Sequence, residues 1–420
     1  MSDTSPSPAR LRVITGEIAP LGDLLEYADP HDPLVLTRRG AWLVGVGAAL
    51  TLTAPGTDAT GLAAQWRRVA DAAVIDDHVG VTGSGLVAFG ALPFDTASAA
   101  PAVLTVPHLV IGHRGERTWA TWVLQDAGEP DPDEPRTVPF GPHWSAAVGP
   151  GALTPEGYQA AVRAGLDAIS AGEVSKVVLA RDIVGTVPAG ADLRRLVRSL
   201  AGGYPDTWVY AVDGLIGASP ETLVTVAGGT VTARVLAGTV ARGADPDTDR
   251  EAALALASSE KDLAEHGYAV RSLVDALTPL TSALAASEQP FTLPLPNVWH
   301  LATDVEATLA GATSALDLLG VLHPTAAVAG TPTDAAVAAI RRIEPSDRGR
   351  YAGPVGWIDA HGDGEWAIAL RGAQFDLAAA TDAGIPFTAH AGAGIVAGSD
   401  PEAELLETRV KFRPIVDALA

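Results

Sequence analysis

Short apolar runs bounded by turn residues recur along the chain and predict a protein rich in β-strands. In the first third of the chain, residues 34–53 predict a β-hairpin. Over residues 61–75 the apolar positions recur at a spacing of three to four, which predicts a helix instead. Further strands are expected over residues 84–89, 103–112 and 117–124.

The remaining two thirds place longer helical segments between the strands. Thr154 is suited to cap a helix that begins with Pro155 and ends near Ala171. A long helix is expected over residues 246–283, with a break near Thr278. Shorter helices are expected over 192–202 and 333–343, and strands over 176–181, 207–213, 221–226, 230–237, 298–308, 353–359 and 365–373.

This order of elements lacks the regular strand–helix–strand spacing of a parallel α/β protein. It predicts an α+β fold, with a large and mainly antiparallel sheet flanked by helices. A segment rich in Asp, Pro and Gly, from Gln125 to Gly151, is the best candidate for a boundary. We expect residues 1–150 to form an N-terminal scaffold portion of the same fold, and residues 151–420 to carry the chemistry.

Composition limits the kinds of site that the protein can contain. The 420 residues include no cysteine, so disulfides, thiolate nucleophiles and thiolate metal ligands are excluded. A metal would have to be bound by oxygen or imidazole, which favours Mg²⁺, Ca²⁺ or Mn²⁺ over a structural zinc. The formal net charge of −22 argues against binding to nucleic acid or to an anionic membrane surface. A local group of basic residues can still bind a small anion.

The chain shows no segment typical of a targeting or membrane-spanning sequence. Residues 1–10 are polar and lack the apolar core of a signal peptide. The most apolar run, residues 41–55, is too short and too rich in Gly and Thr to cross a bilayer. We therefore expect a cytoplasmic protein. Separately, we expect a monomer.

Groups with potential chemistry are concentrated on the helix that is predicted to begin with Pro401 at its first position. There Glu404, Glu407 and Lys411 share one face. Two carboxylates and an ammonium, beside the glycine run that precedes the helix, suggest a site for a metal and an anion. A solvated face stabilised by pairing between helical turns is the structural alternative. Pro414 removes one backbone donor and predicts a kink just past Lys411.

Two positions earlier in the chain are candidate acid–base groups. Lys176 heads a strand and should face the side opposite to Val177 and Leu179, where apolar neighbours could make it a general base. Glu221 lies at the mouth of a Gly/Ser/Pro turn and could act as an acid if its surroundings are dry. The alternatives are a lysine at a strand edge in water and a turn carboxylate that caps backbone amides.

Three further residues could bind ligands. Asp262 and Glu265 lie three positions apart on one helix face, as two acids of the last helix do, and two such pairs could hold one divalent cation. Arg371 ends an apolar strand and could bind a carboxylate through its planar guanidinium. Ordinary surface positions would explain each of these residues as well.

Taken together, ordered motifs over about residues 150–416 resemble those of the chorismate-utilising enzymes, the family of isochorismate, salicylate, anthranilate and aminodeoxychorismate synthases. The motifs are KVVLAR at 176–181, GASPE at 217–221, LAGT at 236–239, SEKD at 259–262 followed by EH at 265–266, WHLAT at 299–303, HPT at 323–325, YAGPVGW at 351–357, GEW at 364–366 and GAGIV at 392–396. The resemblance implies a single α+β domain with a deep active-site cleft that binds chorismate in its C-terminal portion, residues 151–420.

The resemblance also implies roles for individual residues. Lys176 corresponds to the base that activates a water to attack C2 of chorismate, and Glu221 to the acid that protonates the departing C4 hydroxyl. Mg²⁺ is the implied cofactor. The implied metal residues are Glu265 and Glu407 as direct ligands, with Asp262 and Glu404 acting through water. The implied substrate-binding residues are Gly238, Thr239, His300, Thr303, Ala327, Tyr351, Arg371, Gly392, Gly394 and Lys411.

Residue types within the motifs distinguish the branches of the family. Lys176 suggests water rather than ammonia as the nucleophile, and Ala237 stands where aminodeoxychorismate synthases carry a nucleophilic lysine. Isochorismate synthase and salicylate synthase remain, and the runs at 299–303 and 351–357 are more similar to isochorismate synthases of menaquinone and siderophore pathways. We therefore predict an isochorismate synthase, an isomerase, with salicylate synthase as the alternative.

Three residues depart from the family pattern near the expected cleft. Ala326 stands where a second proline is frequent, Val240 where a basic residue is common, and His390 where a larger apolar or aromatic residue is usual. None of them replaces a proposed catalytic group.

Overall fold

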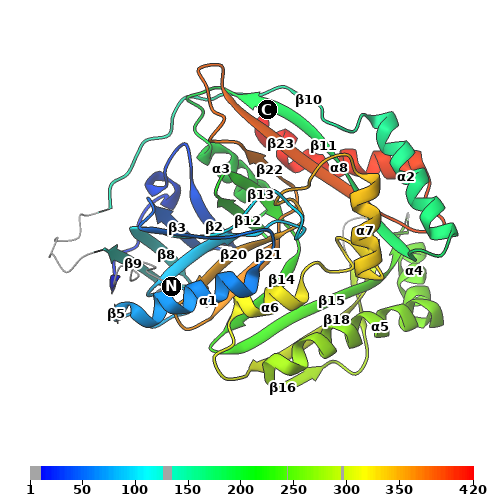
Figure 1. Cartoon of the computed structure of the whole chain (residues 1–420), viewed down its shortest axis with the longest axis horizontal. Helices are drawn as coiled ribbons and strands as arrows, with labels where there is room; N and C mark the ends of the chain where they lie inside the picture. The colour runs from blue at the N-terminus through cyan, green and yellow to red at the C-terminus, as the bar shows by residue number, and fades with distance from the viewer. Residues whose placement is uncertain (1–10, 126–134, 244, 295–297) are drawn as a thin grey trace, which may run out of the picture.

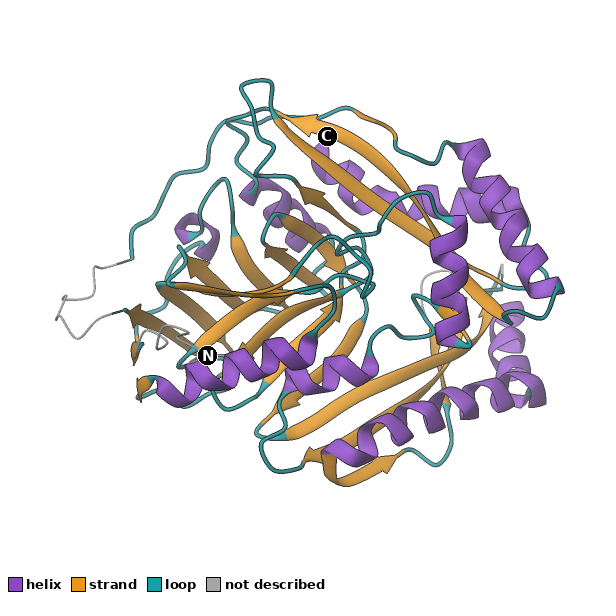
Figure 2. Ribbon diagram, viewed as in Figure 1, coloured by secondary structure: helices purple, strands orange, loops and turns teal. Residues whose placement is uncertain are grey.

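The computed structural model describes residues 11–125, 135–243, 245–294 and 298–420 (Figures 1 and 2). For five residues within these ranges it describes only the backbone, namely Thr239, Ala241, Lys261, Glu265 and Val298. Two large sheets form the centre, and helices cover their outer faces.

The first sheet contains thirteen strands and combines both portions of the chain. Its neighbours are antiparallel except for one parallel pair, β1 with β5. The strands follow the order β10 (Val148–Pro150), β11 (Lys176–Val187), β23 (Ile385–Ile395), β22 (Gly372–Phe375), β13 (Leu215–Ser219), β12 (Trp208–Val212), β2 (Leu34–Arg38), β3 (Ala41–Val46), β8 (Leu109–Arg114), β9 (Arg117–Leu124), β1 (Arg12–Glu17) and β5 (Val74–Asp77), with β19 (Gly330–Thr331) added to β11.

The second sheet contains ten strands, all in antiparallel pairs. Their order is β16 (Thr281–Ala286), β18 (Val298–Leu309), β15 (Thr230–Ala241), β14 (Thr222–Ala227), β21 (Gly364–Ile368), β20 (Pro354–Asp359), β6 (Val87–Ala91), β7 (Ala102–Val106) and β4 (Leu50–Ala54), with β17 (Phe291–Pro294) added to β18.

The two sheets pack face to face over an apolar layer. Leu36 and Tyr210 of the first sheet and Phe89 and Trp357 of the second are buried in this layer. Alternating side chains of each strand point into it, because successive residues of a strand face opposite sides of the sheet. The predicted α+β fold with large antiparallel sheets is confirmed, although the strands form two sheets.

Helices complete the outer layers. On the first sheet α3 and α8 share an apolar cluster with β13 and β23, whereas α4 and α5 pack on β15 and β18 of the second sheet. The helices are α1 (Ala59–Ala72), α2 (Pro155–Ser170), α3 (Arg194–Gly203), α4 (Pro246–Ser258), α5 (Glu260–Leu277), α6 (Ala315–Leu322), α7 (Thr333–Ile343) and α8 (Pro401–Leu419), with short 3-10 helices η1 (Leu24–Tyr27) and η2 (Thr278–Leu280).

Several predicted elements are correct in type but differ in extent. Thr154 caps α2 as expected, with its hydroxyl accepting from the amide of Gly157. The single long helix over 246–283 is wrong, since Ser259 adopts an extended conformation and caps a second helix, α5. The helix α8 continues past Pro414 to Leu419.

The expected strand over residues 365–373 is interrupted in a way that matters for the site. It consists of β21 in the second sheet and β22 in the first, so the chain crosses between the sheets over residues 369–371. Arg371 makes this crossing with a φ of 56°, in the left-handed region that residues other than glycine seldom adopt. The hairpin over 34–53 divides likewise, with β3 in the first sheet and β4 in the second.

No helix within the described ranges is both long enough and apolar enough to cross a membrane.

Candidate active site

The strands β11 and β23 form one face of the candidate site. Their register places Val178 opposite Gly394 and Ala180 opposite Gly392. Since side chains alternate, Lys176 lies on the same face as these residues, as predicted from the strand pattern. A Cβ atom at Gly394 would lie only 3.0 Å from Cε of Lys176, so the glycine leaves the space that the lysine occupies.

Glu221 and Arg371 come from neighbouring connections between the two sheets. Glu221 lies between β13 and β14, and its carbonyl accepts from the amide of Ile368 at 3.0 Å. Arg371 lies between β21 and β22, and its carbonyl accepts from the amide of Ala218 at 3.3 Å. These bonds between backbones hold the two connections side by side.

The charges around Glu221 show which side chains the fold brings together. Burial raises the pKa of the Glu221 carboxyl, while the positive charges of Lys176, Lys411 and Arg371 oppose that rise. These three cations come from β11, α8 and the crossing between the sheets. A carboxyl with a raised pKa keeps its proton at higher pH and is suited to act as a general acid.

Arg371 and Tyr351 offer donors for an anion. Burial lowers the pKa of the Arg371 guanidinium, against the effect of Tyr351, Glu407 and Glu221, but an arginine remains charged. Burial raises the pKa of Tyr351 to about 12, so its hydroxyl stays a neutral donor. Within the described residues, neither the Tyr351 hydroxyl nor the Arg371 guanidinium makes a hydrogen bond to the protein. Both groups are therefore available to a ligand.

The C-terminal helix α8 contributes the predicted stripe of charges. Asp400 caps the helix, and its carboxylate accepts from the amides of Glu402 and Ala403. Lys411 donates from Nζ to the carbonyl of Gly392 at 2.8 Å and forms an ion pair with Glu407.

The two carboxylates of this stripe influence each other. Burial raises the pKa of Glu404, and the nearby charge of Glu407 adds to that effect while Ser399 and Lys411 oppose it. Two acids that crowd in this way on one helix face are suited to a divalent cation.

On the second sheet, a bulge in β15 shapes the opposite part of the site. The pairing of β15 with β18 shifts between Ala237 and Thr239, and Gly238 adopts a φ of 79° at this bulge. Nδ1 of His300 lies 3.4 Å from the Gly238 carbonyl. Burial lowers the pKa of His300, and the nearby charge of Lys176 lowers it further. His300 therefore faces the same region as Lys176.

Thr303 does not share this face, although it was expected to contact the substrate ring together with His300. The two residues are three positions apart on β18, so their side chains point to opposite sides of the strand. The buried Thr303 hydroxyl lies 2.7 Å from Nε2 of His266 on α5, whose Nδ1 donates to the carbonyl of Ala237 at 3.0 Å. Thr303 thus joins α5 to the sheet, and its expected role in substrate binding stays a prediction.

The acid pair on α5 is described only in part. The hydroxyl of Ser259 donates to the carboxylate of Asp262 and accepts from its amide, which closes the first turn of α5. Asp262 also lies beside the bulge, since its Cβ would be 3.3 Å from a Cβ at Gly238. The side chain of Glu265 lies outside the described residues.

The four predicted metal residues come from helices in different parts of the molecule. In Figure 1, α8 lies above α7 and α5 lies below it. Among the side chains that the structure describes, no group of three or more His, Asp or Glu residues is close enough to hold a metal ion. The magnesium site stays a prediction. In kind, oxygen donors at all four positions fit Mg²⁺.

Two predicted substrate-binding residues remain without a described contact. Ala327 is exposed, in the segment between α6 and β19. Thr239 pairs with His300 through its backbone, and its side chain lies outside the described residues. Their proposed roles are therefore predictions.

Sequence reasoning missed a pair of residues that support the site. Glu344 accepts from the amide of Ala180 at 2.8 Å and is paired with Arg348, whose guanidinium also donates to the carbonyls of Val178 and Val328. Both side chains of this pair are nearly inaccessible to solvent. The E-x-x-x-R spacing on its own is common on protein surfaces, and only the fold shows that this pair fixes β11 beside Tyr351.

Comparison with known proteins finds similar sequences over most of the chain. The family model described as "Chorismate binding enzyme" matches residues 141–420. A Mycobacterium tuberculosis protein provisionally named isochorismate synthase MenF is 39% identical over 352 residues, covering 80% of this chain and 87% of that protein. Isochorismate synthase DhbC of Bacillus subtilis is 37% identical over 342 residues, covering 79% and 80%.

The solved structures agree with the fold. The crystal structure of a Bacillus anthracis protein, provisionally assigned as the 2,3-dihydroxybenzoate-specific isochorismate synthase DhbC, superimposes with a TM-score of 0.71. The alignment covers 94% of this chain and 98% of the other, at 30% sequence identity.

Proposed function

The chain belongs to the chorismate-binding enzymes, as its motifs predicted, and from this premise we propose that it is an isochorismate synthase. Such an isomerase interconverts chorismate and isochorismate. The observation that carries the proposal is the position of Glu221, a carboxyl whose pKa is raised by burial beside Lys176, Lys411 and Arg371. This arrangement supplies an acid, a base and anion-binding groups around one space.

In the proposed reaction Lys176 acts as the base and Glu221 as the acid. Lys176 acts in its deprotonated form, whose amine takes a proton from a water molecule while the water oxygen forms a bond to C2 of chorismate. The ring double bond shifts, the bond from C4 to its hydroxyl oxygen breaks, and Glu221 donates a proton so that water leaves. The reverse sequence regenerates chorismate, with the two residues exchanging roles.

The same site supplies donors for the carboxylates of the substrate. We assign Arg371 and Tyr351 to one carboxylate, because both are available for hydrogen bonds and lie near Glu221. Lys411 and the backbone around Gly392 and Gly394 are placed to bind the other. Gly392 carries no side chain on this face, which allows close approach to the backbone, while Gly394 leaves room for Lys176.

We propose Mg²⁺ as the cofactor, held by Asp262, Glu265, Glu404 and Glu407. When bound, the ion would supply positive charge to a substrate carboxylate. Burial raises the pKa of Glu404 and the nearby charge of Glu407 adds to that effect, which supports a cation site at this face of α8. Calorimetric titration with Mg²⁺ alone should show binding that Glu407→Gln weakens.

The test of the function is incubation of the purified protein with chorismate and Mg²⁺, followed by chromatography of the products. We expect an equilibrium mixture of chorismate and isochorismate, reached from either compound. Omission of Mg²⁺ should stop the reaction. Absence of isochorismate at high enzyme concentration would contradict the proposal.

The alternative activity, salicylate synthase, would go on to eliminate pyruvate from isochorismate. A coupled assay for pyruvate separates the two, and stoichiometric pyruvate with salicylate would replace our assignment. A third outcome is calorimetric binding of chorismate with no turnover over hours, which would identify a protein that only binds this anion.

A further inference from the structure

His390, one of the departures from the family pattern, lies on the face of β23 that carries the candidate site. It is two residues from Gly392 in the strand, and alternation places both on one side of the sheet. The ring of His390 stacks on that of Tyr351, with centroids 5.1 Å apart and planes inclined by 19°. Offset stacking at this distance is a favourable geometry for two aromatic rings.

The His390 ring covers one face of the Tyr351 ring and so limits the movement of the Tyr351 side chain. The Tyr351 hydroxyl makes no hydrogen bond within the described residues, so no polar contact holds the phenol in place. Its backbone is fixed, because the amide of Tyr351 donates to the carbonyl of Arg348 at 3.0 Å. The guanidinium of Arg348 lies 6.0 Å from the ring centroid and is itself held by Glu344.

A small cavity lies next to both rings. It has a volume of about 20 Å³ and is lined by both rings together with Arg348, Gln374, Thr388 and Tyr210, among other residues. A cavity of this size has room for about one water molecule. Removal of the His390 ring would join its space to the cavity, and the Tyr351 ring could then rotate away from Arg371.

We propose that His390 is a positioning residue, whose ring holds Tyr351 in place to bind a substrate carboxylate beside Arg371. The inference rests on the proposed function. It gives a role to the histidine at a position where the family usually has a larger apolar or aromatic residue. The ring acts as a neutral group, since burial lowers the pKa of His390 to about 4. A phenyl ring should therefore serve the same purpose.

The experiment compares His390→Ala with His390→Phe and Tyr351→Phe in the chorismate assay. We expect His390→Ala and Tyr351→Phe each to raise KM roughly tenfold or more, the loss typical of a hydrogen bond to a charged group, with kcat within about threefold. His390→Phe should restore most of the KM lost in His390→Ala. The double variant His390→Ala/Tyr351→Phe should be no worse than Tyr351→Phe, because both changes remove one interaction.

Phe387→Leu provides the matched control for lost packing. Phe387 lies on the opposite face of β23 and packs against Phe375, with ring centroids 5.4 Å apart. This variant should lower the unfolding temperature, as His390→Ala does, and leave KM within about twofold, since only a residue that contacts Tyr351 alters its position.

Two results would overturn the inference while the proposed function stands. They are an active His390→Ala enzyme with an unchanged KM, and additive effects of His390→Ala and Tyr351→Phe. If the wild type forms no isochorismate, the proposed function fails instead. Calorimetry with chorismate then tests the inference without turnover. His390→Ala must weaken the binding of chorismate about tenfold, and His390→Phe must restore it. Equal affinity in all three proteins, or no binding, would reject it.

Discussion

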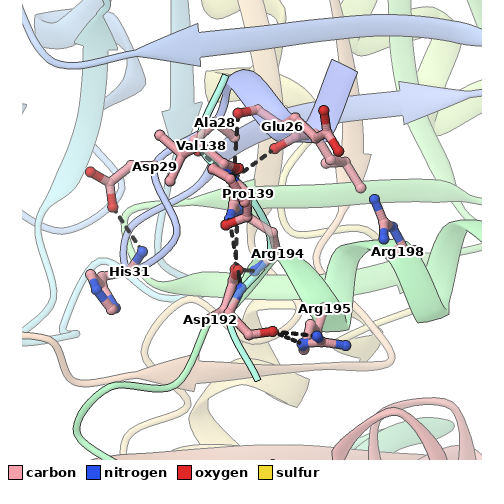
Figure 3. A network of polar contacts seen from close by, with 12 residues as sticks. Glu26, Ala28, Asp29, His31, Val138, Pro139, Asp192, Arg194, Arg195 and Arg198 are labelled. Carbon is pink, nitrogen blue, oxygen red and sulfur yellow. Dashed lines mark hydrogen bonds and ion pairs between the residues drawn. The ribbon is translucent and has the colours of Figure 1, made fainter. Parts of the chain in front are cut away.

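Two groups of charged side chains lie in different parts of the molecule, and they differ in how their charges are compensated. One surrounds Arg194 at the start of α3 (Figure 3) and the other surrounds Glu221 in the candidate active site. In the group around Arg194, other groups of the protein compensate the charges. In the second, charged groups stay available for a ligand.

Around Arg194 the partners are all supplied by the chain. Its inaccessible guanidinium donates to both oxygens of Asp192, at 2.9 and 2.7 Å. Burial alone would raise the pKa of Asp192, but the hydrogen bonds and charge of Arg194, with the amide of Gly141, hold it below its usual value. The remaining donors of Arg194 reach the backbone carbonyls of Leu25, Glu26, Ala28, Val138 and Pro139.

At the candidate site the compensation is incomplete. The pKa of Glu221 is raised and that of Arg371 is lowered, in both cases because burial outweighs the nearby opposite charges. The Glu221 carboxylate makes no hydrogen bond within the described residues. Buried charge with few partners costs stability, so its presence is typical of a functional site. The comparison separates charges that hold the fold together from charges that serve a ligand.

The largest expected effect comes from removing the acid or the base of the candidate site. Lys176→Ala or Glu221→Gln should lower kcat by about 10²–10⁴-fold, the usual contribution of general acid–base catalysis. The unfolding temperature of Glu221→Gln should stay the same or rise, because this change removes a carboxyl whose burial outweighs the opposite charges around it. Steady-state assays and thermal unfolding measure the two quantities.

Normal turnover in either variant would reject the assigned roles. A marked loss of stability in Glu221→Gln would instead reject the comparison, since Glu221 would then be structural. Glu221→Gln is the sharper change, because it keeps the size of the side chain and cannot donate a carboxyl proton.

The Arg194 network should give the opposite result. Arg194→Met keeps the length of the side chain but leaves Asp192 and the carbonyls without their donor, and should lower the free energy of unfolding by about 3–5 kcal/mol. Activity per folded molecule should change little, because Arg194 joins α3 to residues 24–28 and 138–139, none of which belongs to the candidate site. Urea unfolding and the chorismate assay test both statements.

Asp192→Asn gives the matched partner variant. If the two side chains act as one unit, the double variant should be less destabilised than the sum of the single variants. Additive losses would show that the ion pair contributes little and that the carbonyl contacts dominate.

The contrast also shows what the sequence can predict. Alternation along 176–181 correctly placed Lys176 opposite to Val177 and Leu179, because the period of a strand is local information. The same alternation could have separated His300 from Thr303, which lie an odd number of residues apart on β18. The end of α4 at Ser259 was also signalled locally, by the S-x-x-D spacing of a helix cap, and was overlooked.

Other features depend on contacts between distant segments. Apart from Asp192, the partners of Arg194 lie more than fifty residues away in the chain. Most of them are backbone carbonyls, which every residue has, so the residue type does not reveal them. The crossing at Arg371 between two sheets depends on how both sheets pack, so one continuous strand was predicted there. The stacking of His390 on Tyr351 has the same origin, since the loop and the strand meet only in the fold.

Asp359 is intermediate between Asp192 and Glu221, and its contribution to stability should depend on pH. It is buried, and burial together with the neighbouring Asp363 raises its pKa to about 7, although the amides of His361 and Asp363 donate to it. In the unfolded chain this pKa is 3.8. The contribution of Asp359 to stability is therefore fully present below pH 3.8 and is lost as the pH rises to about 7.

The measurement is the difference in free energy of unfolding between Asp359→Asn and the wild type. Between pH 4 and pH 7, the free energy of unfolding of Asp359→Asn should rise relative to that of the wild type by at most about 4 kcal/mol. This limit follows from about 1.4 kcal/mol per pKa unit. Any cost of the amide itself does not vary with pH. A constant difference across this range would show that hydrogen bonds fully compensate the charge, as they do at Asp192.

The smallest effect is expected at Arg198, one helical turn after Arg194. Arg198 pairs with Asp23, and its Cζ lies 3.5 Å from the ring centroid of Phe140, so it resembles Arg194 in its contacts. The difference is exposure, since the side chains of Arg198 and Asp23 are 46% and 39% accessible. Water already solvates both charges, and Arg198→Ala should cost less than about 1 kcal/mol and less still in high salt. A loss comparable with that of Arg194→Met would mean that pairing, and not burial, sets the energy of these arginines.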